Sequence, residues 1–200
     1  ARWSRLNRSM KTQLHDVLAP TRNDEYGFYQ NLLGILPSDM QEEGGRQDLI
    51  TRMKEYMVKA CREAKKHTSW ITPSEPYENA VRRFVEATLK EPDTAFIQDL
   101  LSFQRDISWF GMLNSLSQLL LKLVSPGIPD IYQGNETFRY CLVDPDNRRP
   151  VDFARRQEML HALLERSGKS PDEKRRLLLE LLDNLADGRS KMFVLASTLH

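Results

Sequence analysis

The chain has 200 residues, of which 40% are hydrophobic and 28% are charged, a composition typical of a globular protein of one or two domains. Its 29 Lys and Arg balance 28 Asp and Glu to a net charge of +1, so no long-range field favours nucleic acid or an anionic membrane. No run approaches the roughly 20 apolar residues of a membrane span, and the polar N-terminus lacks a signal-peptide core. We therefore expect a cytoplasmic protein with reduced cysteines that binds neither nucleic acid nor membrane.

Most of the first 125 residues show helical periodicity. Residues 1–14 predict a short helix, and Thr21 with Asp24 predicts the start of a second helix that Pro37 ends. Apolar residues recur at three- and four-residue steps over residues 46–67 and again after Ser74, the expected N-cap of the next helix. Two further helices are expected, one capped by Asp93 and one over residues 105–124. The second of these is apolar on most sides, which predicts a buried helix.

The C-terminal segment also predicts helices. Residues 151–166 are amphipathic, and the stretch SPDEKRRLLLELLDNLADG has a complete set of boundary signals. Ser170 is the expected N-cap, Pro171 takes the first helical position, Glu173 closes a capping box, and Gly188 ends the segment. The last residues, SKMFVLASTLH, are compatible with helix or strand.

The stretch SPGIPDIYQGNETFRYCLVDPDNRRPVD interrupts the helices. Its first part predicts a strand at Ile128–Tyr132 followed by a tight turn at Gly134. A lone strand cannot satisfy its own ladder hydrogen bonds, so without neighbours it should be coil or pair with another molecule. The predicted fold is mainly α, a multi-helix bundle with one isolated strand and loop segment. Three parts are expected: a helical region at 1–125, the strand and loop at 126–152, and helices at 153–200.

The motif KKHTSW has two interpretations. The four histidines are scattered, which disfavours a metal site, and His67 could simply interact with the dipole at the C-terminal end of a helix. Alternatively, His67 and Trp70 could face a groove in which the indole stacks on a sugar ring and the imidazole binds a hydroxyl. Spacing alone leaves both interpretations open.

The loop LVDPDNRRPVD concentrates charged and amide side chains. One interpretation is a turn network that holds itself together through side chain–backbone hydrogen bonds. The other is a polar lining for a hydroxyl-rich ligand, in which Arg and Asp act as paired donors and acceptors. The residues concerned are Asp144, Asp146, Asn147, Arg148, Arg149 and Asp152.

SPGIPDIYQGNE followed by LVDPDNRRPVD resembles the maltooligosyltrehalose synthases, a family of the α-amylase superfamily. The segments APTRNDEYGFYQNLLGILP, YMVKACREAKKHTSW, NSLSQLLLKLVSPG and DGRSKMFVLASTL extend the resemblance over nearly the whole chain. It implies an enzyme that converts the reducing-end α-1,4 bond of a maltooligosaccharide into an α,α-1,1 bond without a cofactor. Ile128–Tyr132 would then be the eighth strand of the catalytic barrel, preceded by a helical insert.

The family's His-Asp-Thr-Lys motif, which carries one of three catalytic carboxylates, has no match in this sequence. The resemblance therefore implies a C-terminal piece of the enzyme that is inactive alone, in keeping with a chain that begins at Ala1 without Met. It implies no catalytic residue here, but substrate-lining roles for His67, Trp70, Gln133, Glu136, Asp144, Asn147 and Arg148. Apolar surface that normally faces the barrel should promote oligomers.

A second hypothesis belongs to a different class of protein. The amphipathic helices could form a free-standing binding or scaffold module, since a helical bundle of this size can fold independently. The natural reading frame distinguishes the two hypotheses, because only the enzyme requires a barrel upstream of Ala1.

Overall fold

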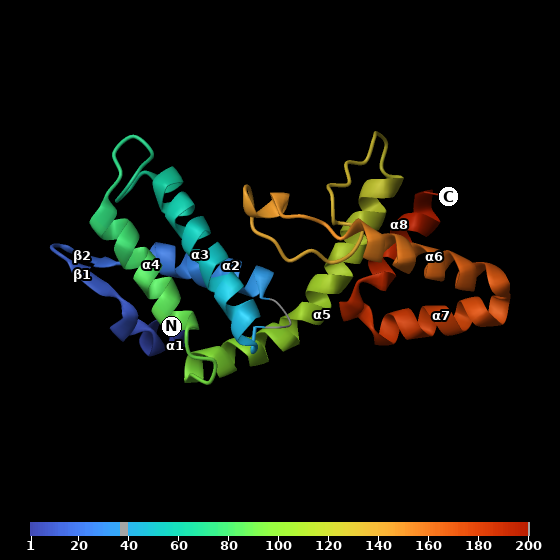
Figure 1. Ribbon diagram of the computed structural model, residues 1–200, viewed down its shortest axis with the longest axis horizontal. Coiled ribbons are helices and arrows are strands. Elements are labelled where there is room, and N and C mark those ends of the chain that lie inside the picture. The colour runs from blue at the N-terminus through green and yellow to red at the C-terminus, as the bar shows by residue number, and fades with distance from the viewer. Residues whose placement is uncertain (37–39, 200) are drawn as a thin grey trace. The chain divides into compact units, whose positions relative to one another are not determined.

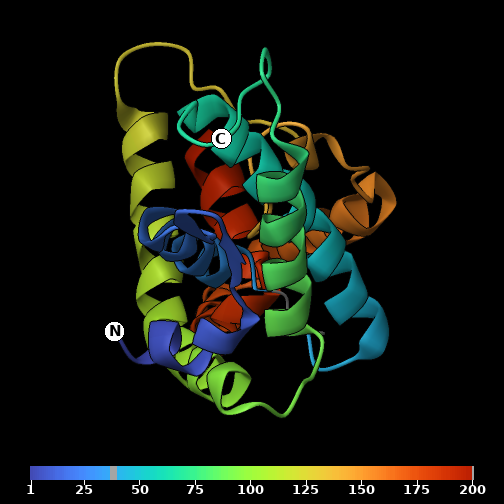
Figure 2. The ribbon, with the colours of Figure 1, turned by 90° about the vertical axis from the view of Figure 1, so that its left-hand side faces the viewer.

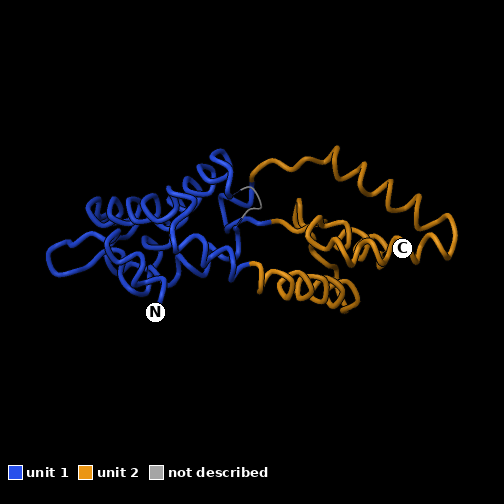
Figure 3. Tube along the Cα trace, turned by 90° about the horizontal axis from the view of Figure 1, so that it is seen from below, with its two compact units in different colours: residues 1–104, 140–148 blue, residues 105–139, 149–200 orange. Residues whose placement is uncertain are grey.

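The computed structural model describes residues 1–36 and 40–199. The chain forms two compact units: unit 1 contains residues 1–104 and 140–148, and unit 2 contains residues 105–139 and 149–200 (Figure 3). One of the sequence predictions, a helix end at Pro37, lies outside the described residues.

Helices dominate both units, which confirms the mainly α prediction (Figure 1). Within residues 1–36 and 40–199 there are eight α-helices, three 3-10 turns and one two-stranded sheet. The helices are α1 (Arg2–Leu6), α2 (Arg22–Ile35), α3 (Glu43–Ala64), α4 (Glu75–Leu89), α5 (Ala95–Val124), α6 (Phe153–Lys169), α7 (Pro171–Asp183) and α8 (Arg189–Leu199). The other elements are β1 (Thr12–Leu14), β2 (Val17–Ala19), η1 (Arg8–Met10), η2 (Asp146–Arg148) and η3 (Leu185–Asp187).

The N-terminal segment differs from the single helix predicted over residues 1–14. After the short α1 and η1, β1 pairs antiparallel with β2, and Leu14 lies opposite Val17. His15 begins the connecting turn in the left-handed region at φ 37°, and the side chain of Gln13 donates to the His15 carbonyl at 2.7 Å. A two-residue turn without glycine gives a weak hairpin signal. The prediction of one helix over residues 1–14 was therefore wrong, because the apolar residues there have helix-like spacing and the turn gives little opposing signal.

The core of unit 1 lies among α2, α3 and α4. The N-terminus of α2 is as predicted, because the Thr21 side chain accepts a hydrogen bond from the Asp24 N–H at 3.3 Å. α3 and α4 form an antiparallel pair joined by the loop of residues 65–74 (Figures 1 and 2). Most of their predicted apolar residues are buried: Leu49, Ile50, Met53, Met57 and Cys61 of α3, and Tyr77, Val81, Phe84, Val85 and Leu89 of α4. Ala60 and Ala64, also expected on the apolar face of α3, are not buried.

α5 corrects two of the sequence predictions. It is one continuous helix rather than two, and the side chain that accepts from its first turn belongs to Thr94, not Asp93: the Ile97 N–H donates to Thr94 Oγ1 at 3.2 Å. The part of α5 in unit 2, residues 105–124, is mostly exposed instead of buried. Apolar periodicity reports which residues avoid water, but it cannot say whether this chain supplies anything to cover them.

Unit 2 has a small core between α6, α7 and α8, formed by Leu163, Leu177, Leu181 and Met192. The start of α7 is as predicted, since Ser170 Oγ accepts from the Glu173 N–H at 3.2 Å and Pro171 opens the helix. The end of this helix differs from the prediction, because α7 stops at Asp183 and Gly188 instead ends the separate turn η3 in the left-handed region. The terminal residues, compatible with helix or strand from sequence, form α8.

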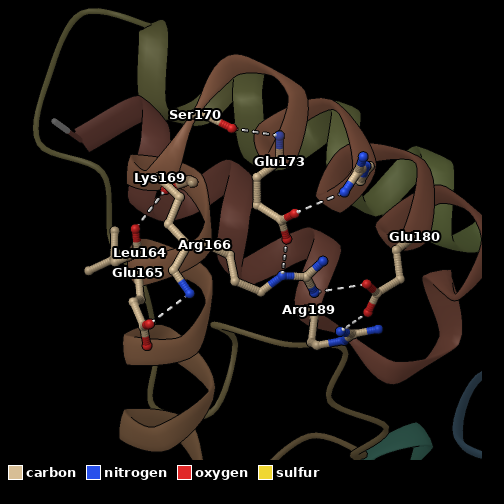
Figure 4. A network of polar contacts seen from close by, with 10 residues as sticks. Leu164, Glu165, Arg166, Lys169, Ser170, Glu173, Glu180 and Arg189 are labelled. Atoms are coloured by element: carbon tan, nitrogen blue, oxygen red, sulfur yellow. Dashed lines mark hydrogen bonds and ion pairs between the residues drawn. The ribbon is translucent and has the colours of Figure 1, made fainter.

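Ion pairs connect the same three helices (Figure 4). Arg166 of α6 donates to Glu173 at 3.0 Å and to Glu180 at 2.8 Å, both in α7. Arg189 of α8 reaches Glu180 at 2.5 Å. The predicted capping box is thus only half formed, because the Glu173 carboxylate pairs with Arg166 instead of returning to the N-cap.

The segment between α5 and α6 contains no strand in the described structure. Ile128–Tyr132 is coil, and Ile128 is 99% exposed. Coil is one of the outcomes expected for a lone strand without neighbours, because an isolated strand leaves its backbone N–H and C=O groups without ladder partners.

Candidate functional site

The residues predicted to line a ligand site divide between the two units. His67, Trp70 and the loop of residues 144–148 belong to unit 1, whereas Gln133 and Glu136 belong to unit 2. Each group therefore has its own structural setting.

The loop of residues 65–74 is held by its own hydrogen bonds. Lys65 ends α3 in the left-handed region at φ 55°. The Ser69 N–H donates to the Thr72 carbonyl at 3.1 Å, and the Thr72 N–H donates to Ser69 Oγ at 2.8 Å. Ser74 is the N-cap of α4, as predicted, but its side chain makes no capping bond; its N–H donates to Thr68 Oγ1 at 2.9 Å. The loop therefore has a defined shape despite its exposure.

The buried carboxylate of Glu78 holds this loop in place through hydrogen bonds. Glu78 of α4 is 2% exposed and accepts from both Nε and Nη2 of Arg62 at 2.7 Å, and from Thr68 Oγ1 at 2.7 Å. The hydrogen bonds from Arg62 lower the pKa of Glu78 below its usual value, and Thr68 lowers it further. Glu78 thus stays ionised and fixes Arg62 in one orientation.

Arg62 in turn positions Trp70. Its guanidinium carbon lies 4.8 Å from the centre of the Trp70 ring, a cation–π contact that occupies one face of the indole. The Trp70 side chain is nevertheless 58% exposed. His67 behaves differently: its imidazole stacks on Tyr77, with ring centres 4.8 Å apart.

A groove of about 460 Å³ opens beside Trp70 on the surface of α3 and α4. Most of its wall consists of hydrogen-bonding side chains around one indole. The lining residues are Thr51, Lys54, Glu55, Val58, Lys59, Arg62, Trp70 and Arg82. Of the two residues predicted in KKHTSW, Trp70 lines this groove and His67 does not.

The DPDNR loop, residues 144–148, is fixed to α3 by two parallel hydrogen bonds between an arginine and a carboxylate. Arg52 donates through Nε and Nη2 to the two carboxylate oxygens of Asp146, both at 2.8 Å, and also to the Tyr140 carbonyl at 2.8 Å. Asp146 accepts from the Leu142 N–H at 2.7 Å. Asp146 therefore has a structural role: the Leu142 bond is of the side chain–backbone kind expected for a turn network, whereas Arg52 of α3 supplies the other bonds.

The predicted ligand residues of this loop lie around that anchor. Asp144 forms an ion pair with Arg148, and the Asp144 carbonyl accepts from Lys59 Nζ at 2.5 Å. Asn147 lies in η2 beside Asp146. Because Lys59 also lines the Trp70 groove, the DPDNR loop adjoins that groove.

Two arginines hold the YQGNE segment of unit 2, residues 132–136, in place. Arg139 donates to the Gln133 carbonyl at 2.5 Å, and Arg156 Nε donates to Glu136 Oε2 at 3.3 Å. Gly134 adopts φ 86°, where a side chain would be strained and would also collide with Arg139. The segment is thus a fixed turn, as the sequence predicted at Gly134.

Sequence reasoning missed the groups that organise these loops. Arg62 and Glu78 are 16 positions apart, and Arg52 and Asp146 are 94 apart. No local spacing marks such pairs. Among residues 1–36 and 40–199, no group of three or more His, Cys, Asp and Glu side chains could hold a metal ion.

No protein-family model matches the chain. Two proteins of Mycobacterium tuberculosis, strains CDC 1551 / Oshkosh and ATCC 25618 / H37Rv, assigned as maltooligosyl trehalose synthases, are 36% identical to it over 136 residues. That alignment covers 68% of this chain and only 17% of each relative.

Solved structures extend the similarity to almost every residue. A crystal structure of maltooligosyl trehalose synthase is 38% identical and superposes with a TM-score of 0.76, covering 99% of this chain and 24% of that one. The maltooligosyltrehalose synthase of Arthrobacter ramosus is 31% identical with a TM-score of 0.70, and the match covers 22% of it. The chain is therefore homologous to a segment of these synthases, and it spans about a quarter of their length or less.

By length and composition, α5 is the one helix of the described chain that could cross a membrane. Its most apolar stretch has a mean hydropathy of 1.2, and only 6% of that stretch is buried. This finding corrects the expectation that no run approaches the length of a membrane span. One such helix is weak support for a membrane location, since core helices of soluble proteins pass the same test.

Proposed function

We propose that the chain is part of an enzyme that converts the reducing-end α-1,4 bond of a maltooligosaccharide into an α,α-1,1 bond, leaving a trehalosyl end. The observation that carries the proposal is the match of 99% of the chain to solved synthases at 31–38% identity. Such a reaction is an intramolecular transglycosylation, which makes the parent enzyme an isomerase that acts in trehalose synthesis in the cytoplasm.

The chemistry fits the scheme of a retaining glycosidase. A carboxylate nucleophile and a carboxylic acid/base act through a transition state like an oxocarbenium ion. The freed glucose must then turn and attack the glycosyl-enzyme while water is kept out. Because the family's His-Asp-Thr-Lys motif is missing from this sequence, we assign the catalytic carboxylates to the rest of the parent protein and expect the chain alone to be inactive.

Within this proposal, each of the two arginine-held loops, considered within its own unit, contributes substrate-binding residues. Gln133 and Glu136 would contribute from the YQGNE turn, and Asp144, Asn147 and Arg148 would contribute from the DPDNR loop. Their support is that both loops present polar side chains on a backbone fixed by hydrogen bonds, so that little ordering remains to oppose binding.

The exposed part of α5 has a role in the same proposal. Its apolar side chains include Trp109 (50% exposed), Phe110 (61%) and Leu121 (64%). A surface of this kind marks an interaction site. Since the homologous synthases are about four times longer than this chain, we assign the covering partner to their remaining part rather than to lipid.

Two experiments test the proposal. The natural reading frame should encode a catalytic barrel upstream of Ala1; a frame that begins near Ala1 would favour the free-standing scaffold module instead. With maltopentaose as substrate, the full-length product should form a trehalosyl end and the 200-residue chain should not. Turnover by the chain alone would contradict the assignment of the carboxylates.

A further inference from the structure

The Trp70 groove has features of a ligand site that the loops described above do not share. Trp70 is large, apolar and 58% exposed, yet its loop is braced by hydrogen bonds and its ring is fixed by Arg62. One ring face is occupied by the guanidinium. An exposed aromatic ring held in one orientation binds a flat partner without the entropic cost of ordering.

The walls of the groove indicate the charge of that partner. Lys54 pairs with Glu86, which keeps the pKa of that carboxyl low, and Lys59 lies 3.8 Å from Glu63. Arg82 lies 3.6 Å from Glu78. These cations are therefore largely neutralised by carboxylates.

The same cations line the groove and keep N–H groups beyond those used in their ion pairs, because an ammonium has three donors and a guanidinium has five. Thr51 and Glu55 add a hydroxyl and an acceptor. A wall with many donors, some acceptors and little net charge suits a neutral, hydroxyl-rich ligand better than a phosphate. The volume of about 460 Å³ lies within the range for small ligands, which suits a short oligosaccharide.

We propose that this groove binds a segment of α-1,4-linked glucan, with one pyranose ring stacked on the indole of Trp70 and its hydroxyls bonded to the side chains of α3 and α4. The choice of an α-glucan rests on the proposed function. The groove itself rests only on the geometry of unit 1. Through Lys59, the groove lies beside the DPDNR loop of the same unit, for which substrate-binding residues are proposed above.

The test follows the indole N–H signals of the 200-residue chain by ¹⁵N–¹H NMR during titration with maltoheptaose. The chain has three tryptophans, so Trp70→Phe identifies the Trp70 signal. We expect that signal to shift and the Trp109 signal to stay in place. Trp70→Ala should weaken binding about tenfold, as the loss of one stacked ring implies, with Trp70→Phe intermediate.

The matched control is Trp109→Ala, which removes another exposed tryptophan, from the unit without the groove, and should leave the affinity unchanged. Cellohexaose, a β-1,4 glucan, and inorganic phosphate should bind more weakly than maltoheptaose. Equal affinity of Trp70→Ala and the unsubstituted chain would overturn the proposal, and preferred binding of phosphate would replace the glucan with an anion.

A second measurement uses the full-length protein. Trp70 should remain open to quenching by acrylamide and become protected when maltoheptaose is added. Protection without sugar would show that the parent chain covers the groove, and would overturn the proposal. If the reading frame and the product assay identify a synthase, but maltoheptaose leaves the Trp70 signal unchanged, only the groove inference fails and the proposed function stands.

Discussion

Glu78 is the residue on which most of the candidate site in unit 1 depends. It is buried and binds Arg62 and Thr68, which in turn hold the Trp70 ring and the N–H of Ser74. A single carboxylate thus connects a helix pair to the shape of an exposed loop. The sequence shows Glu78 as one more acidic residue in the first turn of a helix, where solvent exposure would be expected, so its role could not be predicted.

Protonation of Glu78 should lower the free energy of unfolding of the chain at acidic pH. Its folded pKa is depressed, chiefly by the hydrogen bonds from Arg62, so below its unfolded value of 4.5 the unfolded state binds more protons than the folded state. The stabilisation is present above pH 4.5 and is lost as the pH falls through the folded pKa. Urea unfolding between pH 3 and pH 7 should show this loss in the unsubstituted chain.

Glu78→Gln should lower the free energy of unfolding by roughly 2 kcal/mol at neutral pH, since it removes a charged acceptor from a buried site. Its acid dependence should also be shallower than that of the unsubstituted chain. Glu63→Gln, at an exposed ion pair, is the control and should cost less than about 0.5 kcal/mol. Parallel pH profiles for Glu78→Gln and the unsubstituted chain would contradict this account of Glu78.

At the scale of elements, the sequence predicted best where a segment carries both its own boundary signals and a complete apolar stripe. α7 has a Ser N-cap, a Pro at the first position and leucines that reach the core of unit 2. The hairpin of β1 and β2 was missed because it is short and its turn contains no glycine. The ion pairs that hold the site loops were missed because they join residues far apart in the chain.

The N-cap of α7 provides a test at this scale. Ser170→Ala removes the acceptor of the Glu173 N–H, and loss of such a cap costs about 1 kcal/mol. Amide hydrogen exchange should show faster opening of α7 by the corresponding factor. Ser167→Ala is the control, because that hydroxyl donates to a carbonyl within α6 and caps no helix; its exchange rates should be unchanged. Equal rates in both variants would mean that the ion pairs of Figure 4, not the cap, fix this helix.

At the scale of the whole molecule, the two units have separate cores and differ in how much apolar surface they leave open. The core of unit 1 includes α2, α3 and α4, whereas only a few leucines and one methionine form the core of unit 2. Residues 105–124 of α5 contribute one buried residue, Leu119. Sequence periodicity predicted a buried helix here, and the discrepancy is informative: the pattern fits a larger protein in which more of the chain covers this helix.

Substitutions of the exposed residues of α5 should therefore affect different properties in the two proteins: self-association in the 200-residue chain and stability in the full-length protein. In the 200-residue chain, Phe110→Gln and Leu121→Gln together should reduce self-association in analytical ultracentrifugation and leave the free energy of unfolding almost unchanged, because both side chains face water. In the full-length protein, we propose that the rest of the parent chain covers α5, so each substitution should cost about 2 kcal/mol of stability there. Tyr26→Gln, at a residue that is 62% exposed in unit 1, is the control and should leave self-association as it was. If the pair of substitutions is neutral in the full-length protein, the remainder of the parent chain does not cover this face of α5, which would contradict the proposal.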